Sequence, residues 1–281
     1  CGAATATSIP KINTTMTNNA FHNKVPNNNG EKVTANGAAA VNTFTATGNN
    51  VSGNVGPTTL GEPTGNGYSL ITRAGGTVTG TMTNNVIANN GNAQIFIDAN
   101  TGTVNLPGFA DNDLSRDTAG RDGVFVTALN ATINLGTAAA PWVRNIIEAE
   151  TTDANRRFGI GGTVNVGTLT MHLGDNTLAN RNFIARNGAA GIGFNLLGAN
   201  TADVRIRTND IINTVAGTPA TAGFTGDGVR FILSDTATLL GTSTVDDNNV
   251  IGNAGTGVSV LAQLDSNVNA GFSVVNNTIT G

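Results

Sequence analysis

The sequence predicts an all-β protein of stacked repeats, with three short strands in each repeat. An Asn-rich segment at residues 15–23 returns in similar form at 81–89, and its Asn-x-apolar-x-Asn core returns at 209–213 and 249–253. Apolar-x-apolar segments follow these sites, and this period of two is that of a strand with one buried face. A single repeat is too small to bury its own apolar face, so the repeats are expected to stack.

The composition favours strands over helices. Charged residues make up 11% of the 281 residues and the net charge is -4, whereas 39% of the residues are hydrophobic. This apolar content favours an ordered chain. Gly, Asn and Thr are frequent but are poor helix formers, and no long segment has a helical period. No apolar run is long enough for a transmembrane helix, and the acidic balance disfavours a nucleic-acid partner.

The anchor of each repeat is predicted to be an Asn at a bend. Asn tolerates left-handed backbone angles, and the amides of equivalent residues in stacked strands can hydrogen-bond to one another as a ladder. The interval between Asn85 and Asn145 is about twice the others, so it is interpreted as two repeats, one of which lacks an anchor. The predicted ladder consists of Asn19, Asn50, Asn85, Asn145, Asn182, Asn209, Asn249 and Asn277.

An apolar residue two positions after most anchors is expected to point inward. Stacking would align these side chains in one column, with Ser52 as its weak position. The predicted column consists of Phe21, Ile87, Ile147, Ile184, Ile211, Ile251 and Ile279.

These segments resemble the right-handed parallel β-helix repeat of the pectate-lyase-like superfold. The resemblance is carried by residues 249–251 followed by 257–260, by the matching repeat at Asn182, and by 276–279. Together with the spacing, it implies a right-handed parallel β-helix (β-solenoid) of about nine coils. Residues 81–281 are expected to form the regular part, with loop insertions near 105–122 and 214–227. Residues 1–80 are expected to form loosely packed, Thr/Asn/Gly-rich coils.

One charged patch is the candidate binding site. It consists of Arg205, Arg207, Asp246 and Asp247, which lie just before two successive anchors. The functional interpretation is a patch that binds an acidic sugar. The alternative is an ion pair between coils on a solvated face, which contributes less than ~1 kcal/mol.

Two features of the sequence bear on metal binding and catalysis, an acidic segment and the histidines. A calcium site is one interpretation of the acidic segment near residue 115, but the spacing of a calcium-binding loop is missing, and a solvated loop is simpler. His22 and His172 lie in different repeats without metal-ligand spacing, so no catalytic or metal role is assigned to them. Trp142 either covers a loop or marks a ligand contact. The acidic segment contains Asp111, Asn112, Asp113, Asp117 and Asp122.

The single cysteine, Cys1, excludes an internal disulfide. A Cys followed by Gly at the first position is similar to the lipidated start of a bacterial lipoprotein, and this predicts lipidation at Cys1. The alternative is that Cys1 is only the first residue of a trimmed chain. A secreted or cell-surface location is expected.

The first functional hypothesis is an extracellular structural protein, not an enzyme. Three features favour homo-oligomers joined end to end as a fibre, stalk or sheath, or an adhesin. They are the low charge, the lack of a cofactor motif, and an anchor close to residue 281 without a capping helix. The superfold also includes lyases and hydrolases, so the alternative is a protein that degrades or binds a cell-surface polysaccharide. A third hypothesis is ice binding by Thr rows such as Thr79, Thr81 and Thr83.

Overall fold

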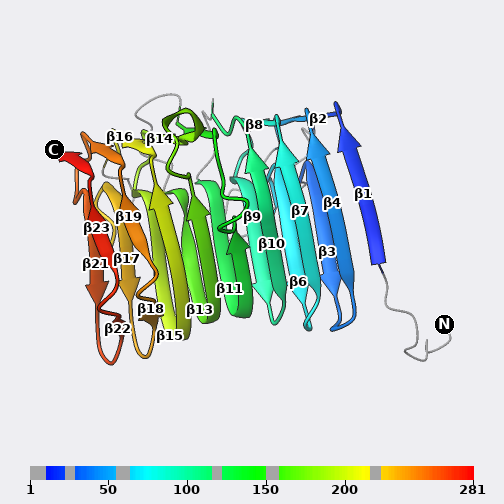
Figure 1. The fold of residues 1–281 in the computed structure, drawn as a ribbon. Helices are drawn as coiled ribbons and strands as arrows, with labels where there is room; N and C mark the ends of the chain where they lie inside the picture. Colours follow the sequence, from blue (N-terminus) through cyan, green and yellow to red (C-terminus); the bar gives the residue numbers. More distant parts are fainter. Residues whose placement is uncertain (1–10, 23–28, 55–63, 116–121, 150–157, 216–222) are drawn as a thin grey trace.

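The structure is a computed structural model that describes residues 11–22, 29–54, 64–115, 122–149, 158–215 and 223–281. These residues form an all-β molecule in which the paired strands run parallel (Figure 1). One short 3-10 helix, η1 (Leu178–Asn180), is present in this part of the chain. The arrangement is compatible with a β-helix-like fold.

The largest sheet has 16 strands, and each strand pairs with its equivalent in the next repeat. In Figure 1 these strands follow one another from the blue end of the molecule to the red end. The sheet consists of β1 (Lys11–Thr17), β3 (Glu31–Asn36), β4 (Val41–Thr47), β6 (Tyr68–Arg73), β7 (Thr77–Thr83), β9 (Ala93–Asn100), β10 (Thr103–Ala110), β11 (Asp122–Leu135), β13 (Phe158–Leu173), β15 (Ala190–Arg207), β17 (Asp227–Leu233), β18 (Thr238–Leu239), β19 (Thr244–Asp246), β21 (Val258–Ala262), β22 (Asn267–Val268) and β23 (Ser273–Val275).

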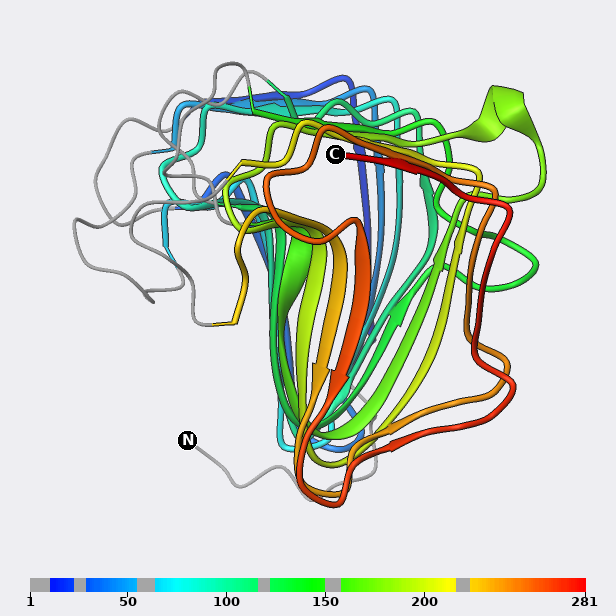
Figure 2. The ribbon, with the colours of Figure 1, turned by 90° about the vertical axis from the view of Figure 1, so that its left-hand side faces the viewer.

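Two smaller sheets cover another side of the molecule. Asp113 forms parallel bridges to Val86 of one sheet and Ile146 of the other, so the two sheets continue one stack. Figure 2 looks along this stack, and corresponding segments of successive repeats lie behind one another around a common interior. The first sheet is β2 (Ala20–His22), β5 (Asn50–Ser52) and β8 (Val86–Ala88), and the second is β12 (Ile146–Glu148), β14 (Phe183–Ala185), β16 (Asp210–Ile212), β20 (Asn249–Ile251) and β24 (Thr278–Thr280).

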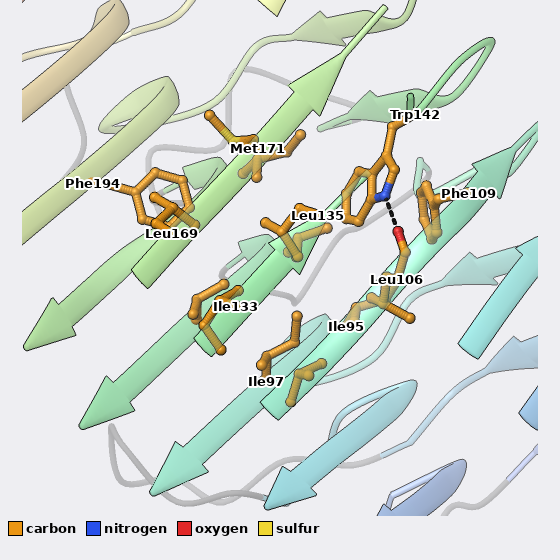
Figure 3. Packing of buried hydrophobic residues seen from close by; sticks show 14 of the residues in the cluster. Ile95, Ile97, Leu106, Phe109, Ile133, Leu135, Trp142, Leu169, Met171 and Phe194 are labelled. Atoms are coloured by element: carbon orange, nitrogen blue, oxygen red, sulfur yellow. Dashed lines mark hydrogen bonds between the residues drawn. The ribbon is translucent and has the colours of Figure 1, made fainter. Parts of the chain in front are cut away.

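The core consists of apolar side chains stacked on their equivalents in neighbouring repeats. Strand β7 alternates between buried and partly exposed residues along its length, which is the predicted period of two. In the large sheet, Val104 pairs in register with Ile133, and Ile133 pairs with Leu169. All three side chains are fully buried. Figure 3 shows Ile133 and Leu169 within this core.

The apolar column of the small sheets differs from the prediction at two positions. Val51, not Ser52, pairs with Phe21 and Ile87, and Val250, not Ile251, pairs with Ile211. Val51 and Val250 are fully buried, whereas Ile251 is exposed. The prediction was wrong by one residue at both places, and in a strand a shift of one residue moves a side chain to the opposite face.

The bends at the anchors also differ from the prediction. The anchor Asn was expected in the left-handed conformation, but the residue before it usually adopts that conformation. Asn84 has φ 55° before Asn85, and Asp247 has φ 56° before Asn248. A second left-handed residue follows four positions after the anchor, as at Asn89. Two such bends separate the three-residue strands of the small sheets from the large sheet.

The strands on either side of residue 80 belong to the same sheet. Strand β7 itself crosses residue 80 and pairs with both β4 and β10. Parts of the two expected insertions, 116–121 and 216–222, lie outside the described residues. An insertion that the sequence analysis did not predict lies at 174–181 and contains η1.

Candidate functional site

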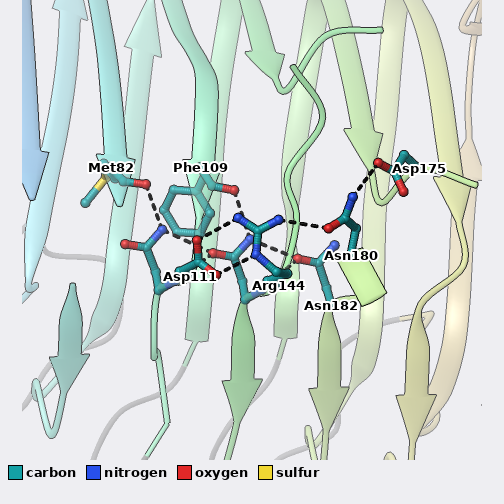
Figure 4. A network of polar contacts seen from close by, with 9 residues as sticks. Met82, Phe109, Asp111, Arg144, Asp175, Asn180 and Asn182 are labelled. Carbon is teal, nitrogen blue, oxygen red and sulfur yellow. Dashed lines mark hydrogen bonds and ion pairs between the residues drawn. The ribbon is translucent and has the colours of Figure 1, made fainter. Parts of the chain in front are cut away.

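The Asn side chains of successive repeats form a hydrogen-bonded ladder (Figure 4). The Nδ2 of Asn145 donates to Oδ1 of Asn182 over 2.9 Å and to the carbonyl oxygen of Phe109 over 3.0 Å. The backbone N–H of Asn145 donates to the same Oδ1 over 3.0 Å. The ladder runs through Asn19, Asn49, Asn85, Asn112, Asn145, Asn182, Asn209, Asn248 and Asn277.

Two predicted anchors, Asn50 and Asn249, are not in this ladder. Their places are taken by Asn49 and Asn248, which are buried, whereas the side chain of Asn50 is exposed. The Nδ2 of Asn249 donates instead to Oδ1 of Asp210 over 2.7 Å. Each error falls on an Asn-Asn doublet, where the sequence offers two equivalent residue types.

Asn112 is the anchor that the sequence analysis missed. It lies 27 residues after Asn85 and 33 residues before Asn145, and it hydrogen-bonds to both. The long interval therefore contains an anchored repeat, contrary to the prediction. The signal was present in the sequence, because Leu114 follows two positions later and is fully buried.

The described residues of the acidic segment make specific contacts, and Asp111 is exposed to solvent as expected. Asp111 forms an ion pair with Arg144 at 2.6 Å, and this hydrogen bond lowers the pKa of Asp111 (Figure 4). Asp113 accepts a hydrogen bond from the backbone N–H of Ser115 over 2.9 Å.

The other acidic residues of this segment are not brought together with Asp111. Asp122 is buried and accepts the backbone N–H of Phe158 over 3.0 Å, and Asp117 lies outside the described residues. Within the described part of the chain, no three His, Cys, Asp or Glu side chains are arranged to hold a metal ion.

The predicted charged patch is only partly brought together. Arg207 lies opposite Asp246 in the register of β15 and β19. Arg205 pairs instead with Asp203 of its own strand at 3.2 Å. Asp246 accepts a hydrogen bond from Asn276, and Asp247 lies 3.5 Å from the hydroxyl of Thr208. The described residues therefore show no ion pair between these arginines and the two predicted aspartates.

Both arginines line a surface cavity of about 240 Å³. The alternation along β15 places them there, because Val204 and Ile206 point into the core and the residues between them point outward. The loop that follows β13 forms another wall of the cavity. The cavity is lined by Ala138, Pro141, His172, Gly174, Asp175, Asn176, Arg205 and Arg207.

His172 forms the buried side of this cavity. Only 5% of the residue is exposed, and its Nε2 lies 3.4 Å from Oδ2 of Asp203. Burial lowers the pKa of His172, although the negative charge of Asp203 partly opposes this. Burial disfavours ionisation of Asp203, but hydrogen bonds from Thr242 and Arg205 outweigh it and lower the pKa of Asp203. The other histidine, His22, lies at the end of β2 in a different sheet.

Trp142 belongs to the core and does not form an exposed aromatic platform. It is fully buried, and its Nε1–H donates to the carbonyl oxygen of Leu106 over 2.8 Å (Figure 3). Its ring stacks on Phe109 with 4.2 Å between the ring centroids. Neither interpretation from the sequence, cover for a loop or a ligand contact, describes this position, because the ring packs inside the core and its N–H is satisfied there.

The Thr rows lie on the outer face of β4 and β7. Thr79, Thr81 and Thr83 pair in register with Thr43, Thr45 and Thr47. The row ends at β10, where Thr81 pairs with Gly108. Ice binding by this face stays a prediction.

Comparison of the chain with protein-family models, curated proteins and solved structures gives no match. The described part of the chain contains no helix with the length and hydropathy that a membrane span requires. Cys1, the predicted lipidation site, lies outside the described residues.

Proposed function

We propose that the parallel sheets form a right-handed parallel β-helix of about nine coils, and that this β-solenoid is an extracellular structural protein. The Asn ladder supports the proposal, because side-chain hydrogen bonds from Asn19 to Asn277 tie successive repeats of the described chain together. The outward positions of β7 are all Thr, and three of the four in β4 are Thr. Such uncharged polar side chains suit an inert stalk, sheath or fibre surface.

End-to-end contact between copies is the assembly that we propose. The observation that supports it is the way the repeats pair: Ile279 pairs in register with Val250 of the preceding repeat through parallel strands, as the other small-sheet strands do. Parallel strands that pair between repeats of one chain can pair in the same way between two copies, and this is the contact that we propose.

Electron microscopy and sedimentation of concentrated protein test this assembly. We expect filaments with a fixed axial repeat in the wild type, and their loss in Ile279→Lys. Thr278→Lys is the matched control, because Thr278 lies next to Ile279 on the same strand but on the opposite face. Monodisperse monomers of the wild type at high concentration would refute end-to-end assembly.

A second candidate function is binding or degradation of a polysaccharide. A polysaccharide partner is favoured by the cavity that Arg205, Arg207 and His172 line, because two neighbouring guanidinium groups suit acidic sugars. Acidic glycans are incubated with the protein, and their chain length and their binding to the protein are then measured. Shorter glycan chains indicate an enzyme, whereas glycans that bind to the protein and keep their length indicate a binding protein.

A secreted or cell-surface location, including a role as an adhesin, remains part of the proposal. Lipidation of Cys1 would anchor the chain to a membrane. Mass spectrometry of the N-terminal peptide from the native source tests this directly, because an added lipid changes its mass by a fixed amount.

A further inference from the structure

Arg207 differs from the other arginines that the structure describes, because it alone has no carboxylate partner. Its Nε–H is buried and makes no hydrogen bond, as is also true of Arg230, so the missing carboxylate is what sets Arg207 apart. A guanidinium without a carboxylate partner is suited to a ligand that supplies the anionic acceptor. The paired arginines are Arg73 with Asp98, Arg144 with Asp111, Arg181 with Asp210, Arg186 with Glu148, Arg205 with Asp203, and Arg230 with Asp227.

The surroundings of Arg207 form a small polar cavity. Arg205 lies two residues earlier on the same face of β15, and Asp203 holds its guanidinium in place at 3.2 Å. His172 lies opposite Arg205 in the register of β13 and β15. The volume of about 240 Å³ falls below that of pockets for drug-sized ligands, so the cavity fits one small group.

We propose that this cavity binds a single carboxylate or sulfate group, with Arg207 as the main contact and Arg205 and His172 beside it. A guanidinium presents its N–H groups in a planar fork that matches the oxygens of either anion. The group is carried by an acidic sugar or by a free small anion, and the experiment below separates these sources. This site deepens the second candidate function and does not depend on assembly.

One negative charge opposes the ligand and limits which anions fit. Asp175 lies on the rim, but its carboxylate already accepts the backbone N–H of Thr177 and the Nδ2 of Asn180, each over 2.8 Å. Arg144 also interacts with Asp175 electrostatically. The free positive charge in the cavity is therefore that of Arg207, and this favours a ligand with one anionic group over a polymer segment with several.

Calorimetric titration of the full chain with glucuronate, sulfate and the neutral sugar glucose tests the proposal. We expect glucuronate or sulfate to bind and glucose not to bind. Arg207→Gln should weaken binding by about 10-fold or more, because a hydrogen bond to a charged group is lost. Arg186→Gln is the matched control, since Arg186 is also partly exposed but is paired with Glu148 elsewhere in the fold. Its affinity should equal that of the wild type.

The relative affinities identify the source of the anionic group. Tighter binding of glucuronate than of sulfate supports a carboxylate on a sugar, whereas equal binding supports recognition of the anionic group alone. Binding of glucose as tight as that of glucuronate, or equal affinity in Arg207→Gln, overturns the proposal. So does the absence of binding by both anions at millimolar concentration.

A second measurement covers the case in which Arg207→Gln does not fold. The ring of His172 in the wild type can be followed by NMR across pH, with and without saturating glucuronate. A carboxylate in the cavity should raise the pKa of His172, because a nearby negative charge favours the imidazolium ion. An unchanged pKa of His172 under saturation would place the anion elsewhere and refute the proposal. Both experiments measure binding of the anion to each chain, whether or not the chains assemble. A failure to form filaments would therefore count against the proposed assembly and not against this site.

Discussion

The Nδ2 of Asn49 donates a hydrogen bond to Oδ1 of Asn85, which lies 36 residues later in the sequence and 3.0 Å away in space. The same Nδ2 also donates to the carbonyl oxygen of Met16 over 3.0 Å. One side chain thus joins three successive repeats in the buried interior. Its neighbour Asn50 has the same chemistry but an exposed side chain.

This pair provides the first prediction. Asn49→Ala should destabilise the protein by about 1–3 kcal/mol, because the buried carbonyl oxygen of Met16 loses its donor at 3.0 Å and the N–H groups of Asn19 lose the acceptor Oδ1 at 2.9 Å and 3.1 Å. Asn50→Ala should change the stability by less than about 0.5 kcal/mol. Chemical denaturation and hydrogen exchange of the flanking strands measure both variants. Equal losses in the two variants would contradict the ladder position.

The apolar column provides a second matched pair, Ile211 and Ile212. Ile211 is fully buried and stacks between Ile184 and Val250, whereas Ile212 points to the other face and is half-buried. Ile211→Ala should cost about 2–5 kcal/mol, as expected for a cavity in a packed core. Ile212→Ala should cost clearly less. Denaturant midpoints give the comparison, and a larger loss in Ile212→Ala would mean that the register is shifted by one residue.

The strands, their stacking and the existence of an Asn ladder could be predicted from the sequence, because these follow from a period of two and from recurrence. The register could not be predicted where two neighbouring residues are chemically equivalent. At Asn49 and Asn50 the amide chemistry cannot choose the register, and only burial of Val51 decides it. Asn112 was missed because its charged neighbours led to the interpretation of a solvated loop.

The candidate site was harder to predict than the fold. Arg205 and Arg207 were identified as charged residues near a bend. Their neighbour His172 comes from the preceding repeat, and the loop of residues 174–181 lengthens the stretch of sequence between them. The lack of a partner for Arg207 depends on which carboxylate each arginine reaches, and this is decided by side-chain positions in three dimensions.

Backbone conformation at Val166 provides the third prediction. Val166 has φ 55°, a left-handed conformation that is unfavourable for a β-branched residue. At the same bend, the preceding repeat has Asn130 and the following repeat has Gly198, both with positive φ. Val166→Asn should therefore stabilise the protein by about 1 kcal/mol.

Thermal denaturation measures this gain. Thr168→Asn is the control, since Thr168 lies on the same strand and is not among the residues with positive φ. This control should not stabilise the protein, because Asn has a lower strand propensity than Thr. A loss of stability in Val166→Asn would mean that the packing of the Val166 side chain outweighs the backbone strain.

The last prediction concerns pH and His172. Burial lowers the pKa of His172 in the folded state below its value in the unfolded chain, ~6.5. As the pH falls through this unfolded value, the unfolded state binds a proton more readily than the folded state, so the free energy of unfolding decreases. Above it, both states hold a neutral imidazole and His172 makes no pH-dependent contribution.

His172→Gln should therefore lose less stability than the wild type between pH 8 and pH 5. The aspartates with lowered pKa, such as Asp111 and Asp203, lose their contribution only as the pH falls below about 4, so they act in a different window. Urea denaturation at several pH values gives the free energy of unfolding of both proteins. The contribution of His22 cancels in the difference between them, because both proteins contain it. Parallel curves for the two proteins would show that His172 titrates as it does in water, and that the cavity beside Arg207 is more hydrated than the geometry of β13 and β15 indicates.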